Sequence, residues 1–300
     1  MPANKTNPAP SGVPAALAAY GIWGFLPLYL LLVKSVPPFE FVGWRIIWTL
    51  PICLVIVLIR GQWANVRQAI AQRRSISILC LTASIIGANW LIYVWAIQNG
   101  NVYAASLGYY INPLINILLG TVLLGERLSR MQWIAVLLAG CGVAVLLAGA
   151  LDTLWISLAL ASSFAVYGLL RKQLDVGSLP GLTIESAVLF FPAVAIAWWY
   201  ASGPQGSSFA VSWQLSSYIV LGGFLTAIPL LLFAVAARRM EYSTLGFFQY
   251  IAPTLVFIIG LTVFEQELKP AQAASFALIW TAIAVFLWDM WKRSRAVSVA

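Results

Sequence analysis

Long apolar runs follow one another along the whole chain, and charged or turn-forming residues close each run at both ends. A helix rises about 1.5 Å per residue, so a run of about twenty residues can cross the hydrocarbon core of a bilayer. The pattern therefore predicts ten transmembrane helices. The expected spans are 12–33, 39–59, 75–97, 102–124, 131–149, 151–172, 182–201, 215–237, 243–264 and 271–291.

The basic residues divide the loops between these spans into two groups. Of the 17 Lys and Arg residues, nearly all fall in the tails or in every second loop. The exceptions are Lys34 and Lys269 in the other loops and Arg45 within the second span. Cytoplasmic loops carry an excess of Lys and Arg, so we expect both termini to be cytoplasmic. Residues 1–11 would then form a polar N-terminal tail, and residues 292–300 a basic C-terminal tail.

The overall composition supports a membrane protein. Of the 300 residues, 62% are hydrophobic and 9% are charged, and the mean hydropathy is +0.91. These values lie outside the range of soluble domains. The net charge of +8 is spread over loops and tails, so no nucleic-acid partner is expected. The chain has no His and only isolated Cys residues, so we expect neither a metal site nor a cofactor.

Two segments in the fourth and ninth spans resemble each other. Residues 106–113 and 244–253 each place a hydroxyl, a Leu-Gly step, two aromatic rings and an amide ahead of a proline. A proline frees a backbone carbonyl, which in lipid must face protein or a water-filled cavity. Simple kinking of two helices is the alternative. The recurrence favours two helix breaks, at Pro113 and Pro253, that line a cavity.

This repeated segment divides the chain into two halves. Residues 12–150 and 151–291 would each contain five helices, and the odd number gives the second half the opposite orientation. Inverted repeats are typical of secondary transporters whose substrate site lies near the midplane between the halves. The predicted fold is therefore all-α and integral to the membrane, with an inverted five-plus-five repeat.

The same residues resemble the RarD family. The similar segments are Glu40 with Arg45 and Trp48, 87–90, 105–113, 125–127, 131–133, Tyr167-Gly168 with Arg171-Lys172, 184–185, 229–230 and 243–250. They extend over nearly the whole chain. The resemblance implies an EamA-type member of the drug/metabolite transporter superfamily, located in the inner membrane. It also implies that helices 1–4 and 6–9 surround the cavity while helices 5 and 10 lie outside, and it defines no substrate.

Polar and aromatic residues within the spans are candidates for the substrate site. Arg45 and Asn89 lie at similar depths, about 9 and about 12 Å from the outer ends of their helices. A buried arginine is costly in a bilayer and marks a functional site by default, although it can also cap carbonyls freed by a proline. Its guanidinium can bind a carboxylate by donating two hydrogen bonds. The expected substrate-binding residues are Trp23, Arg45, Asn89, Tyr93, Tyr109, Asn112, Gln249 and Tyr250.

Each of these candidates also has a structural interpretation. Asn112 and Gln249 can form hydrogen bonds between helices, and the aromatic residues can serve packing. In the fifth span, Gly140, Ala144 and Ala148 form a small-residue face suited to close helix packing. A homodimer is an open alternative to a monomer.

A proton-coupled cycle would need a carboxylate, because the chain has no His. Glu185 is the main candidate, since it lies about one turn inside the seventh span among apolar residues, and Glu40 is the second. For Glu185 the alternatives are a solvated carboxylate or an ion pair with Arg171 or Lys172. Glu40 lies five residues from Arg45 on a different helix face, so it is at best a partial counter-ion for that arginine.

The sequence thus predicts a secondary transporter, a carrier or exporter of small amphipathic metabolites or drugs that works by alternating access. The alternative is an integral-membrane enzyme acting on a lipid. No Walker, zinc or nucleophile-elbow motif supports that alternative, so we expect no enzyme. A channel would require repeated rings of polar residues. The expected partners are a small-molecule substrate and the lipid bilayer.

Overall fold

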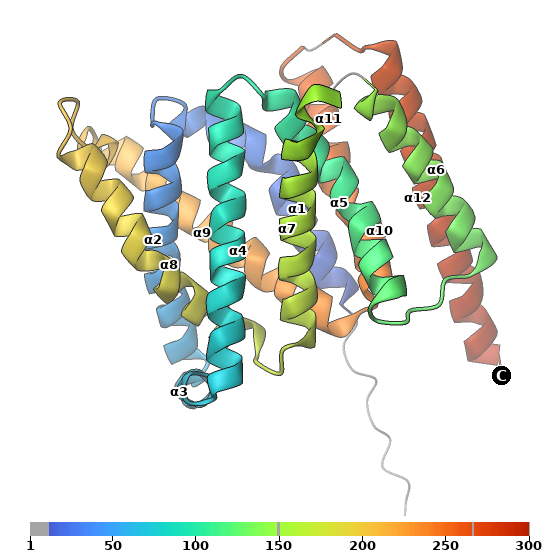
Figure 1. Cartoon of the computed structure of the whole chain (residues 1–300), viewed down its shortest axis with the longest axis horizontal. Coiled ribbons are helices and arrows are strands. Elements are labelled where there is room, and N and C mark those ends of the chain that lie inside the picture. Colours follow the sequence, from blue (N-terminus) through green and yellow to red (C-terminus); the bar gives the residue numbers. More distant parts are fainter. Residues whose placement is uncertain (1–11, 149–150, 266, 300) are drawn as a thin grey trace, which may run out of the picture.

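The computed structural model describes residues 12–148, 151–265 and 267–299, and in these ranges every regular element is a helix (Figure 1). Ten helices are long and apolar enough to cross a membrane, as the sequence predicts. The α-helices are α1 Val13–Leu30, α2 Pro38–Ile59, α3 Trp63–Ala71, α4 Arg73–Gln98, α5 Val102–Val122, α6 Arg130–Leu147, α7 Leu154–Gln173, α8 Ser178–Ala201, α9 Trp213–Arg239, α10 Tyr242–Gln249, α11 Ile251–Thr262 and α12 Pro270–Val299. Short 3-10 turns are η1 Leu31–Val33, η2 Leu151–Thr153 and η3 Ser208–Ala210.

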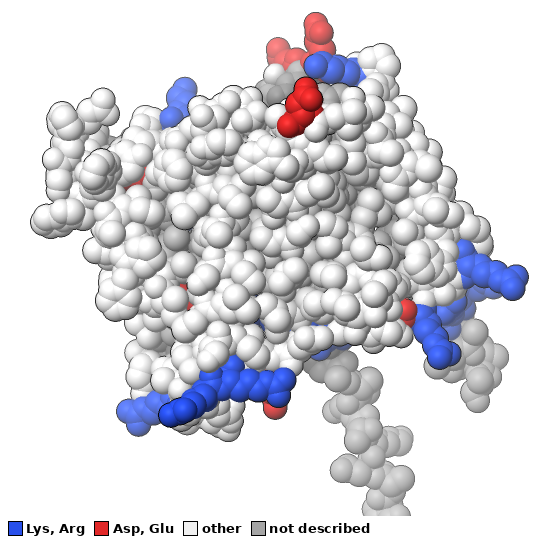
Figure 2. All heavy atoms as spheres, in the orientation of Figure 1, with Lys and Arg blue, Asp and Glu red and all other residues white. Residues whose placement is uncertain are grey.

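The helices run up and down in a single bundle. The start of α1 and the end of α12 lie at the same end, where the short helix α3 also lies (Figure 1). Figure 2 shows that basic side chains gather at this end, whereas the opposite end carries most of the visible acidic ones. The two ends of the bundle therefore differ in charge as the loop pattern predicts.

Corresponding helices of the two halves pack against each other. The second and seventh spans pair as α2 with α8, the fourth and ninth as α5 with α10, and the fifth and tenth as α6 with α12. The first helix of each half packs on the third helix of the other half, as α1 on α9 and α7 on α4. This arrangement is consistent with an inverted five-plus-five repeat.

The two helices expected to lie outside the bundle do so together. The helices α6 and α12 pack along each other at one edge of the molecule (Figure 1). Helix α6 starts with a capping box, in which the Ser129 hydroxyl accepts from the backbone N–H of Gln132 and the Gln132 side chain accepts from that of Ser129. This cap fixes the start of α6 just after the loop from α5.

The two prolines of the repeated segment behave differently, which corrects one prediction. The ninth span is divided into α10 and α11 at Tyr250, three residues before Pro253. Helix α5 instead runs unbroken through Pro113. Side-chain hydrogen bonds from Asn112 to α7 and from Asn116 to α10 hold α5 on both sides of the proline. A helix anchored in this way tolerates the loss of one backbone hydrogen bond.

Some boundaries also differ from the prediction. Helix α12 continues to Val299, so the basic segment after residue 291 extends the last helix. The predicted N-terminal tail, 1–11, and the boundary between the halves at 150 lie outside the described residues. The loop 60–72 contains α3, whose Val66 and Ala69 are buried while Trp63 and Ile70 stay exposed.

Candidate functional site

A half-buried arginine lies between α2 and α4. The guanidinium carbon of Arg45 is 4.6 Å from the centroid of the Trp90 ring, a distance at which the cation is attracted to the ring face. The Nε atom of Arg45 is buried and has no hydrogen-bond partner. Burying such a donor without a partner costs free energy. The arginine is therefore held by an aromatic ring and keeps a donor free.

Tyrosines surround this guanidinium. Tyr29, Tyr93 and Tyr109 are close enough to interact with Arg45 electrostatically. The rings of Tyr93 in α4 and Tyr109 in α5 meet edge to face, with centroids 6.1 Å apart. The structure thus brings together three of the predicted substrate-binding residues, Arg45, Tyr93 and Tyr109. We call these three residues with Trp90 the arginine cluster.

A small pocket in the bundle has Trp90 in its lining. It is lined by Ile46, Thr49, Ile86, Trp90, Tyr167, Leu182, Glu185, Ser186, Leu189 and Leu230, from α2, α4, α7, α8 and α9. Its cavity volume is about 10 Å³, which leaves room for about one water molecule. In this lining, Trp90 belongs to the arginine cluster and Glu185 is the carboxylate. In this conformation the pocket is too small for an amphipathic molecule.

Glu185 is paired with a fully buried arginine. Its Oε1 lies 3.6 Å from the Nε of Arg171 and accepts a hydrogen bond of 2.6 Å from the Thr82 hydroxyl. The Tyr167 hydroxyl donates to Oε2 at 3.3 Å. The solvated carboxylate is therefore wrong, because Glu185 is 2% exposed, and the alternative of an ion pair with Arg171 is confirmed. Lys172 instead donates to the carbonyls of Ala237 and Met240 at the end of α9.

The space for Arg171 comes from a glycine in α8. A Cβ added to Gly181 would lie 2.0 Å from Nη1 of Arg171, so a larger residue here would displace this guanidinium. Nη2 of Arg171 donates to the Ser178 carbonyl in the first turn of α8. Tyr167 and Arg171 are four residues apart on α7, as Gly181 and Glu185 are on α8, so each pair lies on one helix face. These faces of α7 and α8 bring Arg171 and Glu185 together as an ion pair.

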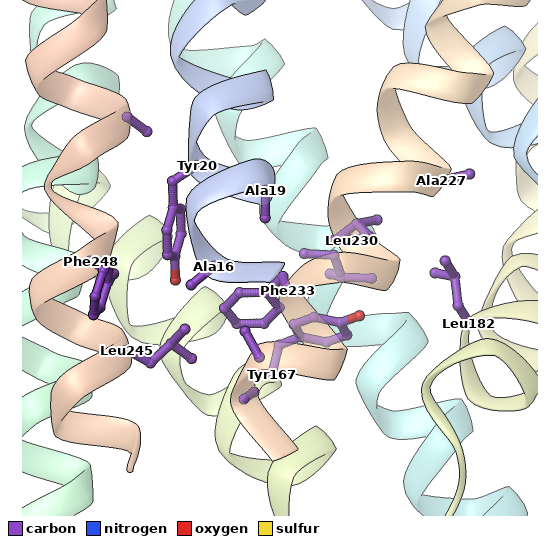
Figure 3. Packing of buried hydrophobic residues seen from close by; sticks show 14 of the residues in the cluster. Ala16, Ala19, Tyr20, Tyr167, Leu182, Ala227, Leu230, Phe233, Leu245 and Phe248 are labelled. Atoms are coloured by element: carbon purple, nitrogen blue, oxygen red, sulfur yellow. The ribbon is translucent and has the colours of Figure 1, made fainter. Parts of the chain in front are cut away.

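An aromatic cluster lies beside the pocket. Figure 3 shows the Tyr167 ring against Phe233, with Tyr20 between α1 and the helix that carries Leu245 and Phe248. Trp23 belongs to this cluster, with ring centroids 5.7 Å from Tyr20, 5.8 Å from Phe164 and 6.0 Å from Phe233. The structure therefore places Trp23 in aromatic packing.

Three predicted amides link helices. The Asn89 side chain donates to the Leu160 carbonyl and to the Ser163 hydroxyl, so it faces α7 although its neighbour Trp90 contacts Arg45. Asn112 donates to the Ala161 carbonyl at 2.8 Å, and Gln249 accepts from Asn116 at 2.6 Å. These contacts correspond to the structural interpretation of amides in a membrane bundle. Tyr250, next to Gln249 in the chain, is fully buried, and its hydroxyl has no hydrogen-bond partner among the described residues.

Glu40 holds the loop between α8 and α9. It is fully buried and accepts hydrogen bonds from Trp44, from both Ser207 and Ser208 hydroxyls, and from the Ser208 backbone N–H. Phe209 in the same loop stacks on Trp44 with ring centroids 4.4 Å apart. Among the described residues no ion pair joins Glu40 to Arg45. This agrees with the prediction that Glu40 is at best a partial counter-ion for Arg45, because the loop takes up its carboxylate.

Several residues of this region are absent from the predicted site. Arg171 lies in the last turn of its helix as the span predicts, but its full burial is new. Trp90 and Tyr167, which line the pocket, and Thr82, which donates to Glu185, are not among the predicted site residues. The spacing of Tyr167 and Arg171 on one face of α7 was the available signal. Within the described residues, no group of three His, Cys, Asp or Glu side chains gathers closely enough to hold a metal ion.

Known proteins resemble this chain along nearly its whole length. A model of the EamA-like transporter family matches residues 10–148. The protein RarD of Salmonella typhimurium is 42% identical over 96% of this chain and 97% of its own length. The chain belongs to the RarD family of EamA-type transporters. The protein RarD of Streptomyces exfoliatus is 40% identical, with 96% of this chain and 92% of that protein covered.

Other relatives agree with this assignment. The chloramphenicol-sensitive protein RarD of Pseudomonas aeruginosa is 29% identical over 93% of this chain and 94% of its own length. A solved crystal structure of another protein aligns with a TM-score of 0.72 and covers 92% of this chain and 98% of the other, at 20% identity. That likeness supports the fold alone. As a member of the RarD family, the chain is a multi-pass transporter of the inner membrane, of the drug/metabolite type.

Proposed function

We propose that this RarD-family protein is a secondary carrier of small amphipathic molecules that bear a carboxylate or a similar anionic group. Arg45 carries this proposal, because it is the arginine beside the pocket that has no acidic partner among the described residues. A substrate carboxylate supplies the acceptor that Nε lacks, in the bidentate geometry that arginine favours. The family membership supports transport in general, and the substrate class is our addition.

The arginine cluster can contact both the anionic group and the apolar body of an amphipathic ligand. The anionic group meets Arg45 with the hydroxyls of Tyr93 and Tyr109 nearby, and an apolar body packs on the Trp90 ring and the apolar wall of the pocket. In this proposal Asn89, Asn112, Gln249, Tyr250 and Trp23 hold the helices around the pocket rather than touch the substrate.

Alternating access requires the closed pocket to open toward each side in turn. One set of closing contacts is the Glu40-held loop with Phe209 on Trp44, and the other is the Arg171–Glu185 pair with the aromatic cluster. Glu185 is our candidate for proton coupling, because its protonation would remove the counter-charge of Arg171 and loosen the second set. Glu40, bound by loop donors, is the weaker candidate for that role.

We further propose that both termini are cytoplasmic. The basic end of the bundle, which contains α3, the start of α1 and the end of α12, supports this orientation under the positive-inside rule (Figure 2). Single cysteines at Gly203 and Leu268, in a background without Cys53, Cys80 and Cys141, should react with a membrane-impermeant maleimide from outside intact cells. Reaction at either position only after the cells are opened would reverse the orientation.

A ligand-stabilisation screen tests the substrate class. The purified protein is heated with amphipathic carboxylates and with their neutral amides, and the melting temperature is compared between wild type and Arg45→Ala. We expect carboxylates to stabilise the wild type and the variant to lose this response. Arg60→Ala, at the other end of the same helix, serves as the matched control and should respond like wild type. Stabilisation by amides alone would reject an anionic substrate.

A further inference from the structure

An apolar groove opens on the surface between α5 and α6, apart from the transport pocket. It is lined by Leu114, Ile117, Leu118, Thr121, Trp133, Val136, Leu137, Gly140, Cys141 and Ala144, and its volume is about 460 Å³. Leu118 is 56% exposed and Leu137 is 66% exposed, so the walls of the groove lie on the outside of the bundle. In a membrane this surface faces the lipid.

The groove remains open because α6 uses a different face for helix packing. A Cβ added to Gly142 would lie 2.9 Å from the Ser275 carbonyl of α12, so Gly142 is the close-packing glycine. A Cβ added to Gly140 would meet nothing within 4 Å. The small-residue face predicted from the sequence at Gly140 and Ala144 is therefore not a helix contact in this structure. These small residues form the floor of the groove.

Positive charge stands at one end of the groove. Thr121 is in the last turn of α5 and Trp133 in the first turn of α6, so the groove reaches the loop between these helices. That loop carries Arg127, and α6 begins at Arg130. Both arginines are exposed, and no described carboxylate pairs with either of them.

The nearby acids are occupied elsewhere. Glu126 accepts from the backbone N–H groups of Tyr242 and Ser243 at the start of α10. Asp289 pairs with Arg293 at 2.9 Å and accepts from the Ser129 hydroxyl. The two arginines therefore present uncompensated positive charge at the level where an apolar groove begins.

We propose that this groove binds an anionic phospholipid of the surrounding leaflet, with one acyl chain along the groove and the phosphate on Arg127 and Arg130. Basic residues next to a membrane helix attract anionic headgroups, and Arg binds phosphate through paired hydrogen bonds. Trp133, 46% exposed, lies at the headgroup level where tryptophan is favoured. The site is independent of the arginine cluster and of the transported substrate.

Native mass spectrometry of the delipidated protein tests the headgroup contact. Phosphatidylglycerol and phosphatidylcholine with the same acyl chains are titrated separately. Each arginine near the surface contributes about a fivefold preference for anionic lipid, so Arg127→Ala/Arg130→Ala should weaken phosphatidylglycerol binding about 25-fold. Binding of phosphatidylcholine should weaken less, because its choline group offsets the phosphate charge. Arg73→Ala/Arg74→Ala removes the same charge at the same end of the bundle, away from the groove, and should bind like wild type.

A second variant tests the acyl-chain contact. Gly140→Leu/Ala144→Leu fills the floor of the groove without touching either arginine, and should weaken the binding of both lipids. Equal affinity of wild type for the two lipids would overturn the proposal, as would an unchanged preference in Arg127→Ala/Arg130→Ala. Thermal unfolding of each variant without lipid confirms that the proteins compared are folded.

The remaining occupant of such a groove is a second copy of this chain. Cys141 lines the groove and is exposed, so two copies joined here would bring their Cys141 thiols together. Oxidation of membranes should yield no disulfide-linked dimer through Cys141 if lipid fills the groove. A dimer that forms in membranes, and is lost in Gly140→Leu/Ala144→Leu, would replace the lipid with a protein partner.

Discussion

The two halves of this transporter follow one helical plan but place their buried charge differently. In the first half, Arg45 rests on an aromatic ring and has no acidic partner among the described residues. In the second half, Arg171 is fully buried against Glu185. The fourth helix of the first half, α5, is continuous, whereas its counterpart is divided into α10 and α11. The second half thus pairs its buried arginine with a carboxylate and has an interrupted helix. The first half has an arginine without such a partner and a continuous helix.

This difference suggests that one arginine stabilises the fold and the other binds the substrate. A buried ion pair holds its partners because loss of either leaves an uncompensated charge. A lone arginine in a membrane bundle costs free energy and gains no such partner, so it is expected where a ligand supplies the missing charge. We therefore assign Arg171 to the architecture and Arg45 to the substrate.

The largest expected effect is on stability at the charge-balanced site. Arg171→Ala should lower the free energy of unfolding by about 3–5 kcal/mol, because Glu185 is left buried without its partner. Arg45→Ala should change it by no more than about 1 kcal/mol, since no carboxylate loses a partner. Denaturant unfolding of both variants in the same detergent measures this contrast. Equal losses would remove the distinction between the two arginines.

Glu185 distinguishes coupling from substrate exchange. Glu185→Gln cannot take up a proton, so accumulation driven by a pH gradient should be abolished in proteoliposomes while substrate exchange continues. Glu126→Gln is the matched control, because Glu126 only caps α10 and should keep both activities. Exchange in the same vesicles shows that the variant is folded. Uphill accumulation that survives in Glu185→Gln would leave facilitated diffusion as the mechanism.

The two prolines should give a smaller effect that differs between the halves. Pro253→Ala restores a backbone N–H that can bond the Gln249 carbonyl and join α10 to α11. A hydrogen bond contributes about 1 kcal/mol, so exchange should slow about fivefold. Pro113→Ala should change the rate less than about twofold, because α5 is already continuous. Exchange rates of both variants in proteoliposomes measure this difference. Equal slowing in both would mean that the break between α10 and α11 has no special role.

Most of the fold could be predicted from the sequence. The number and spacing of the helices follow from apolar runs of bilayer length, which is why the expected spans agree with the structure to within a few residues at most ends. The different behaviour of Pro113 and Pro253 could not be predicted, since both follow the same motif. It depends on Asn112 and Asn116, whose partners lie on helices distant in the sequence.

The candidate site could be predicted only in part. The lone arginine is visible in the sequence because charge is rare within the spans. Tyr93 and Tyr109, two other candidates from the sequence, interact with it electrostatically. The burial of Arg171 in the last turn of α7 could not be predicted, because it depends on the space left by Gly181 in another helix. Asn89, expected in one layer with Arg45, donates to α7, since depth along a helix does not fix which neighbour a side chain faces.

Substrate counterflow through Arg45 variants tests the central claim most directly. Proteoliposomes containing wild type, Arg45→Lys or Arg45→Ala exchange a carboxylate substrate and its neutral amide, each taken from the stabilisation screen. A charged hydrogen bond contributes about 2 kcal/mol, so Arg45→Ala should reduce the ratio of carboxylate to amide exchange about thirtyfold. Arg45→Lys keeps the charge and should retain part of that ratio. A ratio equal to that of wild type in Arg45→Ala would contradict the assignment of Arg45 to the substrate.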